Sequence, residues 1–573
     1  MVANIKNFLG NKILELVKSN EHLPNLDFKF IFSLLKLGRI TTEKEVNFHL
    51  NVQPLIKAKY SLNSIISKFN LKNDTIINSV CEEVNQEKKS IITIKINCDY
   101  FINEVLQNND YFENLLNPKL SNGDKIIVDF SSPNIAKPFH VGHLRSTIIG
   151  NFISNLYSFF SYDTTRLTYI GDWGTQFGLL NIGLNKLNLS DDDLKQNPIE
   201  LLYKAYVEGN RLSQSDSSIA DEARRVFQCL ETGEQTYELQ RWKRFKEFTA
   251  KELARTYDRL GIKFDVYNWE SMYTAKNILP LIKQMQDRGL LSNEDGKLVV
   301  KLDSGRSATL LKSDGATLYL TRDIAAALDR YKSYNCKHML YVVDNSQTEH
   351  FIALKDILSA MEFNWAKNIQ HIKFGRVKGM STRKGQVVFM KDILDEAKER
   401  MHQKQIESPT TKLMSDDITD ILGISAVVVN DLKQKRLKDY EFNWDIALQI
   451  DGDTGIKLQY THCRLTSLEK NCGVSLPNHC DPKLLQEPEA LLLIQEIARF
   501  DDILLNSFNN LEACTLVKYL FQLCNATSRA LKVLKIKHET RDIGAQRLLL
   551  FNRSKIVLYR GMKILGLQPL EEM

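Results

Sequence analysis

The chain has 573 residues, of which 43% are hydrophobic and 25% charged, and its formal net charge is +6. This length is enough for about two to four domains, and the composition is that of a soluble globular protein rather than a disordered one. No apolar run approaches the ~18 residues that a membrane span needs. The mildly basic charge is compatible with a nucleic-acid partner but does not require one.

The nine cysteines are scattered and include no Cys-x-x-Cys pair. The densest group, Cys472, His479 and Cys480, lacks a fourth ligand at the spacing of a zinc finger, so we expect no structural zinc. An odd number of unpatterned cysteines is typical of a reducing compartment.

Residues 1–113 are expected to form a separate α+β domain. Apolar residues recur at helical spacing around residues 62–69, and isoleucines alternate with other residues over 90–97. Such alternation predicts a half-buried strand. The patterns assign no catalytic chemistry to this part of the chain.

The stretch Asp129–Arg145 holds the strongest chemical signal. The apolar residues 126–128 before it predict a buried parallel strand, and two prolines exclude regular structure in the loop that follows. From His143 onward apolar residues recur at helical spacing. His140, Gly142 and His143 are therefore expected at the start of a helix, where free N–H groups and a partial positive charge favour phosphate.

A glycine-rich loop, Gly171–Gly178, follows the β-branched residues 165–170. Glycines predict a tight turn at a strand end, and such loops carry ligands in doubly wound sheets. Residues from about 181 to 291 have a charged, helical pattern, with one long amphipathic helix over Arg241–Arg259. We expect them to form an insertion between two halves of a sheet, and a solvated helical pair explains the pattern equally well.

Asp323 is a candidate ligand-binding carboxylate. Residues 317–320 predict a strand end, Thr321 a helix cap and the following alanines a helix, so that Asp323 falls in the first turn. Many acidic residues there only complement the helix dipole, which contributes about 0.3–1 kcal/mol. The functional alternative is a carboxylate that binds a guanidinium. The next strand, residues 339–343, is followed by the polar segment Asp344–His350.

The last expected strand, residues 369–374, leads into a basic loop, Gly375–Gly385, that contains four cations and three glycines. Such a loop suits a leaving pyrophosphate, although a solvated surface loop explains the bare pattern as well. From about residue 416 the spacing predicts a helix bundle. The bundle includes Gln459–Arg464, whose aromatic and cationic side chains suit unstacked bases.

Taken together, the motifs resemble those of arginyl-tRNA synthetases, a family of the class I aminoacyl-tRNA synthetases. The His-Val-Gly-His of residues 140–143 is similar to the first class signature, His-Ile-Gly-His. The sequence Gly-Asp-Trp-Gly-Thr-Gln-Phe-Gly of residues 171–178 matches the arginyl pattern throughout, and residues 459–464 resemble the opening of the anticodon-binding bundle.

The second class signature, Lys-Met-Ser-Lys-Ser, is present in an altered form. Met380 and Ser381 are kept, but Gly379 and Thr382 replace its two lysines, as in many arginyl enzymes. In those enzymes a lysine inside the first signature is thought to supply the missing charge, and the matching residue here is Lys137. The resemblance leaves the roles of Arg383 and Lys384 open.

The resemblance implies an α/β fold with three domains. A Rossmann-like parallel-sheet catalytic domain would span residues 114–415 and carry the helical insertion, which would face the acceptor stem. An N-terminal α+β domain (1–113) would contact tRNA, and an all-α anticodon-binding bundle (416–573) would follow. We expect the catalytic part to remain soluble without the bundle.

The implied activity is that of an arginine–tRNA ligase. L-Arginine and ATP, accompanied by Mg²⁺, would give arginyl-adenylate and diphosphate, and arginine would pass to the 3′ end of tRNA(Arg). We expect no metal site on the protein itself. The implied catalytic residues are Lys137, His140, His143, Arg383 and Lys384; the implied L-arginine-binding residues are Asp129, Ser132, Pro133, Asn134, His143, Tyr319, Asp323 and Gln347; and the implied ATP-binding residues are His140, Gly142, His143, His350, Met380 and Ser381.

Two other functions stay open from the sequence. A nucleotidyltransferase of the same superfamily shares the His-x-Gly-His loop but is usually small and lacks the bundle, whereas a non-catalytic RNA-binding paralogue should have lost signature residues. The sequence around residues 139–153 is most similar to animal mitochondrial arginyl-tRNA synthetases. We therefore expect a monomer in the mitochondrial matrix, with a cytoplasmic enzyme as the alternative and no membrane partner.

Overall fold

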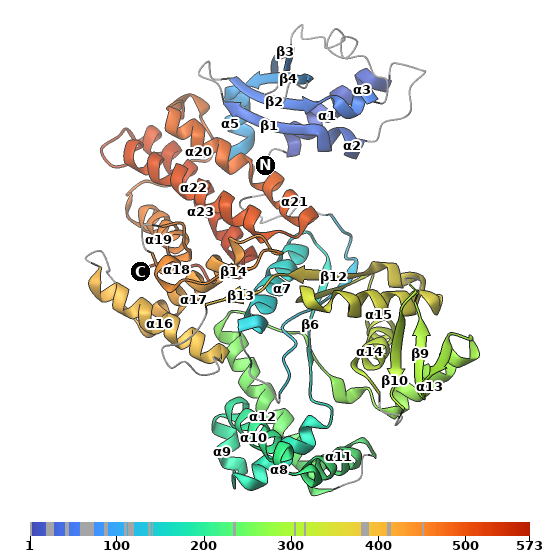
Figure 1. Ribbon diagram of the computed structural model, residues 1–573. Coiled ribbons are helices and arrows are strands. Elements are labelled where there is room, and N and C mark those ends of the chain that lie inside the picture. Colours follow the sequence, from blue (N-terminus) through green and yellow to red (C-terminus); the bar gives the residue numbers. More distant parts are fainter. Residues whose placement is uncertain are drawn as a thin grey trace.

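Five parallel strands form the central sheet of this computed structural model, in the order β12–β11–β5–β6–β7 (Figure 1). They are β5 (Lys125–Asp129), β6 (Asp163–Ile170), β7 (Val266–Trp269), β11 (His338–Asp344) and β12 (Ile369–Phe374). β5 comes first in the chain but lies in the middle, because the chain adds β6 and β7 on one side and β11 and β12 on the other. In such a sheet ligands bind outside the carboxyl ends of the strands where the order reverses, here β5 and β11.

The structure describes residues 3–18, 28–40, 45–57, 74–84, 90–107, 112, 120–135, 139, 141–232, 236–302, 305–313, 317–379, 389–408, 414–449 and 452–573. Lys137, His140 and residues 380–388, which contain the altered second signature, lie outside these ranges. The helix expected around residues 62–69 lies outside them as well.

The two faces of the sheet are buried against different helices. Ile126 and Val128 of β5 pack in a core shared with α7 (Val141–Phe159) and the C-terminal helices. Ile127 points to the other face and packs in a second core, formed by α13 (Ala275–Asp287), α14 (Tyr319–Tyr334) and α15 (Thr348–Ala360). Successive side chains of a strand alternate between faces, so a continuous apolar run suits a strand that is covered on both sides. The expected buried strand is confirmed.

A helical insertion separates β6 from β7. It consists of α8 (Gln176–Lys186), α9 (Asp191–Gln196), α10 (Pro198–Ser215), α11 (Ser217–Thr232) and α12 (Tyr237–Arg259). The range expected from the sequence, 181–291, was wrong at its end, because β7 pairs in parallel with β6 and belongs to the sheet. A strand of four residues is too short to show a period of its own.

A small antiparallel sheet, in the order β10–β9–β8, follows α13 and was not expected from the sequence. Its strands are β8 (Leu291–Glu294), β9 (Lys297–Lys301) and β10 (Ser307–Leu311). β10 precedes α14 in the chain, and the Thr321 hydroxyl of α14 donates to Leu310 O of β10.

The N-terminal part is an α+β unit with the sheet order β1–β2–β4–β3. Its elements are α1 (Ala3–Lys18), α2 (Phe28–Leu34), β1 (Leu35–Ile40), β2 (Glu45–Asn51), α3 (Gln53–Lys57), β3 (Ile77–Val84), β4 (Ser90–Asn97) and α5 (Cys98–Leu106). The expected strand at 90–97 is confirmed. Figure 1 shows this unit against the C-terminal helices rather than on the catalytic sheet, and Lys6 forms an ion pair of 2.6 Å with Asp502 there.

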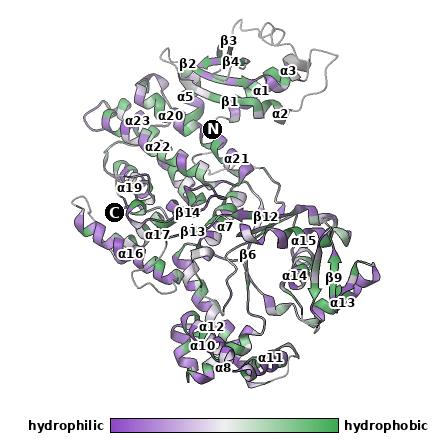
Figure 2. Ribbon diagram, in the orientation of Figure 1, coloured by the Kyte–Doolittle hydropathy of each residue, from purple (hydrophilic) through white to green (hydrophobic). Residues whose placement is uncertain are grey.

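The C-terminal part is helical, as expected. It contains α17 (Asp416–Leu432), α18 (Trp444–Ala447), α19 (Gly455–Asn471), α20 (Pro488–Ala498), α21 (Phe500–Asn510), α22 (Ala513–Val533) and α23 (Arg541–Ile564), preceded by α16 (Met390–Glu407). In Figure 2 these helices carry hydrophobic and hydrophilic residues together along their lengths, as amphipathic helices do.

The first helix of the catalytic sheet packs directly on the bundle. α7 contacts α17, α21 and α23, and their apolar residues belong to one continuous core. This continuity argues against our expectation that the catalytic part remains soluble alone. Among the described helices, none combines the length and apolarity needed to cross a membrane.

Candidate active site

The first signature lies where β5 ends and α7 begins. α7 starts at Val141, two residues earlier than the sequence suggested, so Gly142 and His143 occupy its first turn. The ring of His143 lies 5.5 Å from that of Phe139. The first N–H groups of a helix and an imidazole are suitable donors for a phosphate. Lys137 and His140 lie outside the described residues, so their roles stay predictions.

The loop after β5 is held in an uncommon backbone conformation. Ser131 and Ser132 have φ angles of 71° and 45°, in the left-handed region that non-glycine residues rarely adopt. Polar contacts hold the loop: the N–H of Ser131 donates to Ser146 Oγ over 2.9 Å, and Thr147 Oγ1 donates to Ser131 Oγ over 2.7 Å. Strained backbone persists only where the surrounding contacts hold it in place, and it is found mostly at functional sites.

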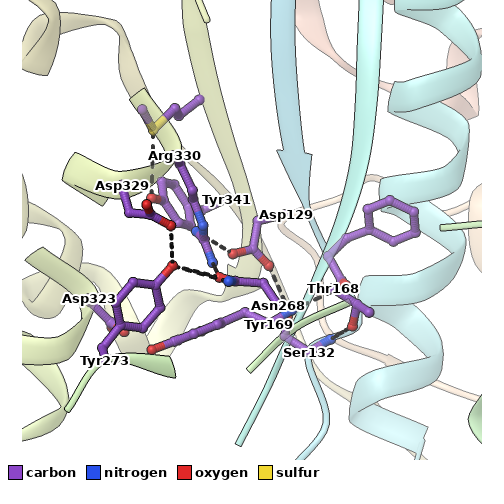
Figure 3. Close-up of polar contacts among 12 residues, drawn as sticks. Asp129, Ser132, Thr168, Tyr169, Asn268, Tyr273, Asp323, Asp329, Arg330 and Tyr341 are labelled. Carbon is purple, nitrogen blue, oxygen red and sulfur yellow. Dashed lines mark hydrogen bonds and ion pairs between the residues drawn. The ribbon is translucent and has the colours of Figure 1, made fainter. Parts of the chain in front are cut away.

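Asp129 is paired with an arginine of the protein itself (Figure 3). Its Oδ2 accepts a hydrogen bond of 2.8 Å from Arg330 Nη1, and its Oδ1 accepts one of 2.7 Å from Ser132 Oγ. Burial raises the pKa of the Asp129 carboxyl, and the guanidinium of Arg330 opposes that rise. Arg330 also donates to Asn268 Oδ1 over 3.0 Å. Asp129, expected beside the substrate guanidinium, thus already has a guanidinium partner.

Asp323 lies on α14 and faces a histidine. α14 begins at Tyr319, so Thr321 is inside the helix rather than at its cap, and its hydroxyl donates to Leu310 O over 2.6 Å. Asp323 is therefore in the second turn, where it is a poor partner for the helix dipole. Its Oδ2 lies 2.6 Å from His350 Nε2. In the structure His350 lies against this carboxylate, and its expected contact with the nucleotide stays a prediction.

Two residues near Asp323 were missed from the sequence. Glu270 follows β7 and pairs with Arg322 Nη1 over 3.1 Å; burial raises its pKa to about 8, Arg322 opposes the rise, and Asp323 adds to it. The hydroxyl of Tyr169, at the end of β6, is buried without a hydrogen-bond partner among the described residues. Figure 3 shows the Tyr169 ring turned toward Asp323. Glu270 was hidden because we assigned its segment to the helical insertion.

The glycine-rich loop has a structural task. Asp172 is fully buried and accepts hydrogen bonds from Ser271 N (2.9 Å) and Ser271 Oγ (2.7 Å), with Lys246 Nζ 3.0 Å away. The Lys246 ammonium lies over the rings of Trp242 and Trp269, at 4.5 and 4.4 Å. The loop thus ties α12 to the segment after β7. We expected a ligand loop, and in the described structure Asp172 is an anchor instead.

One glycine of that loop sets the position of a predicted arginine-binding residue. Gly171 N donates to Pro133 O over 3.0 Å, and Ile135 N donates to Gly171 O over the same distance. A Cβ on Gly171 would lie 2.7 Å from Asn134 Nδ2, so a side chain at this position would displace the Asn134 amide. Pro133 and Asn134 are therefore fixed between the ends of β5 and β6.

The predicted arginine-binding residues that the structure describes come from three parts of the chain. Asp129, Ser132 and Asn134 come from the end of β5, Tyr319 and Asp323 from α14, and Gln347 from the turn after β11. Tyr319 and Gln347 are exposed, which suits contact with a ligand. Met380, Ser381, Arg383 and Lys384 lie outside the described residues.

Comparison with known proteins identifies similar chains. The family model described as tRNA synthetases class I (R), catalytic domain, matches residues 102–444, and the one described as DALR anticodon binding domain matches residues 458–573. The chain is 42% identical over 478 residues to the cytoplasmic arginine–tRNA ligase of Saccharomyces cerevisiae, which covers 79% of this chain and 77% of that one. It is also 42% identical over 452 residues to the probable mitochondrial arginine–tRNA ligase of Mus musculus, and the aligned region covers 78% of each chain.

A solved structure has the same fold. The crystal structure of arginyl-tRNA synthetase from Plasmodium falciparum matches with a TM-score of 0.77, over 100% of this chain and 99% of that one, at 24% identity. At this identity the match supports the architecture alone.

Proposed function

Because this chain belongs to the class I arginyl-tRNA synthetases and is an arginine–tRNA ligase, we propose that the cluster of residues around Asp323 binds the arginine to be activated. The enzyme joins arginine to tRNA(Arg) with ATP as the second substrate.

The observation that carries the arginine site is a carboxylate whose contact is not with an arginine. Asp129 is paired with Arg330, and Glu270 with Arg322. Asp323 belongs to the same cluster, since its charge raises the pKa of both other carboxyls, yet among the described residues it contacts a histidine, His350. A substrate guanidinium would supply the planar cation that the other two carboxyls already have. Its planar N–H fork suits a carboxylate, and the Tyr169 hydroxyl offers an additional acceptor.

The remaining predicted residues hold the rest of the substrates. Asn134 and Gln347 would bind the α-amino and α-carboxyl groups of arginine, at the carboxyl ends of β5 and β11. The first turn of α7, with Gly142 and His143, would hold the phosphates of ATP. His143, together with His140 and Lys137, would stabilise negative charge as the arginine carboxylate attacks the α-phosphate. Met380, Ser381, Arg383 and Lys384 would bind the leaving diphosphate.

Mg²⁺ would enter with ATP as the substrate MgATP. The described residues include no group of three or more His, Cys, Asp or Glu side chains that could hold a metal ion. Mg²⁺ commonly keeps several waters and is held through substrate phosphates, so a dedicated protein cage is not needed.

The larger partners are assigned by domain. The C-terminal bundle would bind the anticodon, with the exposed Tyr460 of α19 as one contact, whereas the neighbouring Gln459 is buried and donates to Ser425 Oγ over 2.9 Å. We propose a monomeric enzyme of the mitochondrial matrix; relatives named for the mitochondrion and for the cytoplasm are equally similar. Light scattering and imaging of a tagged chain test these two points.

Arginine-dependent ATP–diphosphate exchange, measured with tRNA present, tests the reaction. We expect exchange with arginine and not with lysine, and a loss of about 10²–10³-fold in His143→Ala, the usual cost of one transition-state donor. Exchange without any amino acid would indicate a nucleotidyltransferase. Binding of tRNA without exchange would indicate a non-catalytic paralogue.

A further inference from the structure

Arg145 is almost completely buried, with 1% of its surface exposed, at a junction of three parts of the chain. It lies on α7 two residues after His143. From there its side chain reaches the end of β12 and the segment that joins α17 to α18. A buried guanidinium needs partners for its five N–H groups, so its contacts show which segments it holds together.

The guanidinium joins backbone from both sides of the junction. Arg145 Nη1 donates to the carbonyl of Gly375, just after β12, and to Lys438 O over 3.0 Å. Nη2 donates to Lys435 O over 3.4 Å. Gly375 opens the basic loop, whereas Lys435 and Lys438 follow α17. One side chain of α7 therefore binds the start of the loop that contains the second signature and the segment that follows α17.

A carboxylate and an aromatic ring complete this contact. Arg145 Nε lies 3.2 Å from Asp431 Oδ1, but its N–H is not directed at that oxygen, so the pair is ionic rather than hydrogen-bonded. The Tyr440 ring lies 5.1 Å from the guanidinium carbon, and the Tyr440 hydroxyl donates to Asp431 Oδ1 over 2.7 Å. Burial raises the pKa of Asp431, and the charge of Arg145 opposes that rise.

The two backbone segments are also joined to each other. β13 (Val377–Lys378) pairs in parallel with β14 (Tyr440–Glu441). Arg376 N donates to Asp439 Oδ1 over 2.7 Å, and a Cβ on Gly375 would lie 2.7 Å from Leu437 O. The chain enters the second signature directly after β13. Its starting point is thus attached to the bundle, and both are attached to α7 through Arg145.

We infer that Arg145 is a positioning residue for adenylate formation. It fixes the first turn of α7, which holds His143, relative to two other segments. One is the segment from Gly375 through β13, which leads into the second signature, and the other is the segment that follows α17. This inference rests on the proposed function, because both signatures must act on one ATP. A displacement of about 1 Å between groups that act on one transition state costs roughly 10²-fold in rate.

Arg145→Lys tests this role because it keeps the positive charge. A lysine ammonium cannot bind carbonyls on both sides of the junction in the planar geometry of a guanidinium, so the junction should loosen. We expect the kcat of arginine-dependent diphosphate exchange to fall about 10–100-fold, since the reacting groups lose alignment. The KM for arginine should change less than about 3-fold, because Asp323 and its neighbours lie on other elements.

Tyr440→Phe is the milder variant and covers the case in which Arg145→Lys does not fold. It keeps the ring beside the guanidinium but removes the hydrogen bond to Asp431, and we expect kcat to fall about 3–10-fold without a matching change in the arginine KM. Tyr519→Phe is the matched control, because its buried hydroxyl donates to Glu496 O over 2.7 Å within the bundle. It should lower the melting temperature and leave kcat unchanged.

The outcomes separate the inference from the proposed function. A lower melting temperature with unchanged kcat in both Arg145→Lys and Tyr440→Phe would overturn the positioning role and leave Arg145 as a structural residue. A rise in the arginine KM alone would overturn it too. If the unmodified enzyme shows no arginine-dependent exchange, the proposed function fails instead.

Discussion

Replacing Asp323 by asparagine removes the one carboxylate of the cluster that we assign to the substrate guanidinium. The substitution keeps the shape of the side chain and an oxygen that accepts hydrogen bonds, so α14 and the contact with His350 should persist. The substitution removes the negative charge that pairs with the planar guanidinium group of arginine. A hydrogen bond to a charged group contributes about 1.5–3 kcal/mol. The Asp323 side chain is 25% exposed, which favours the middle of that range.

A loss of about 2 kcal/mol corresponds to roughly a 30-fold increase in the arginine KM. The ATP KM should change little, because the phosphates lie at the start of α7. Discrimination against lysine should also weaken, since the variant no longer offers a carboxylate to the fork. Steady-state diphosphate exchange, with arginine and then ATP as the varied substrate, measures all three quantities.

Asp329→Asn is the matched control on the same helix. Asp329 is exposed and accepts hydrogen bonds from the hydroxyls of Tyr273, over 3.0 Å, and Ser333, over 3.5 Å. That substitution should leave the arginine KM within about 2-fold of normal, as expected for a change outside the binding site. If Asp323→Asn behaves like this control, Asp323 does not bind the guanidinium and its assignment to the substrate is refuted.

Two further predictions follow from burial. With its pKa near 8, Glu270 is mostly neutral at pH 7 and mostly ionised at pH 9, beside Arg322, Asp323 and Asp172. The added negative charge should lower the arginine KM about 3–10-fold between pH 7 and pH 9. If Glu270→Gln shows the same pH dependence of KM, Glu270 is not its source. Deleting residues 416–573 removes every partner named above for Arg145 except Gly375, and it uncovers the face of α7 that packs on α17, α21 and α23. Each large apolar side chain exposed costs about 1.5–3 kcal/mol, so about five of them would offset most of the ~5–15 kcal/mol stability of a typical domain. A soluble, cooperatively melting fragment 1–415 would contradict this estimate.

The sequence by itself determined what depends on neighbours along the chain. The apolar residues before Asp129 predicted a strand, and the spacing of the apolar residues after His143 predicted a helix. The first signature was therefore placed at a strand-to-helix junction. The alanines after Asp323 predicted a helix, but its start at Tyr319, which puts Tyr319 and Asp323 on one face, came from the structure. The resemblance of the motifs to one family added the activity, because those motifs are short and local.

Only the tertiary structure decided how the buried charges pair. Asp129 meets Arg330, 201 residues later, and Arg145 meets Lys438, 293 residues later. No period in the sequence encodes such contacts, since they depend on which strand ends meet at one edge of the sheet. The same holds for Glu270, which follows a strand of four residues that carries no period of its own. The structure therefore added an internal arginine partner to Asp129, whose contact with the substrate stays a prediction, and it showed Asp323 as the carboxylate of this cluster that faces a histidine instead of an arginine.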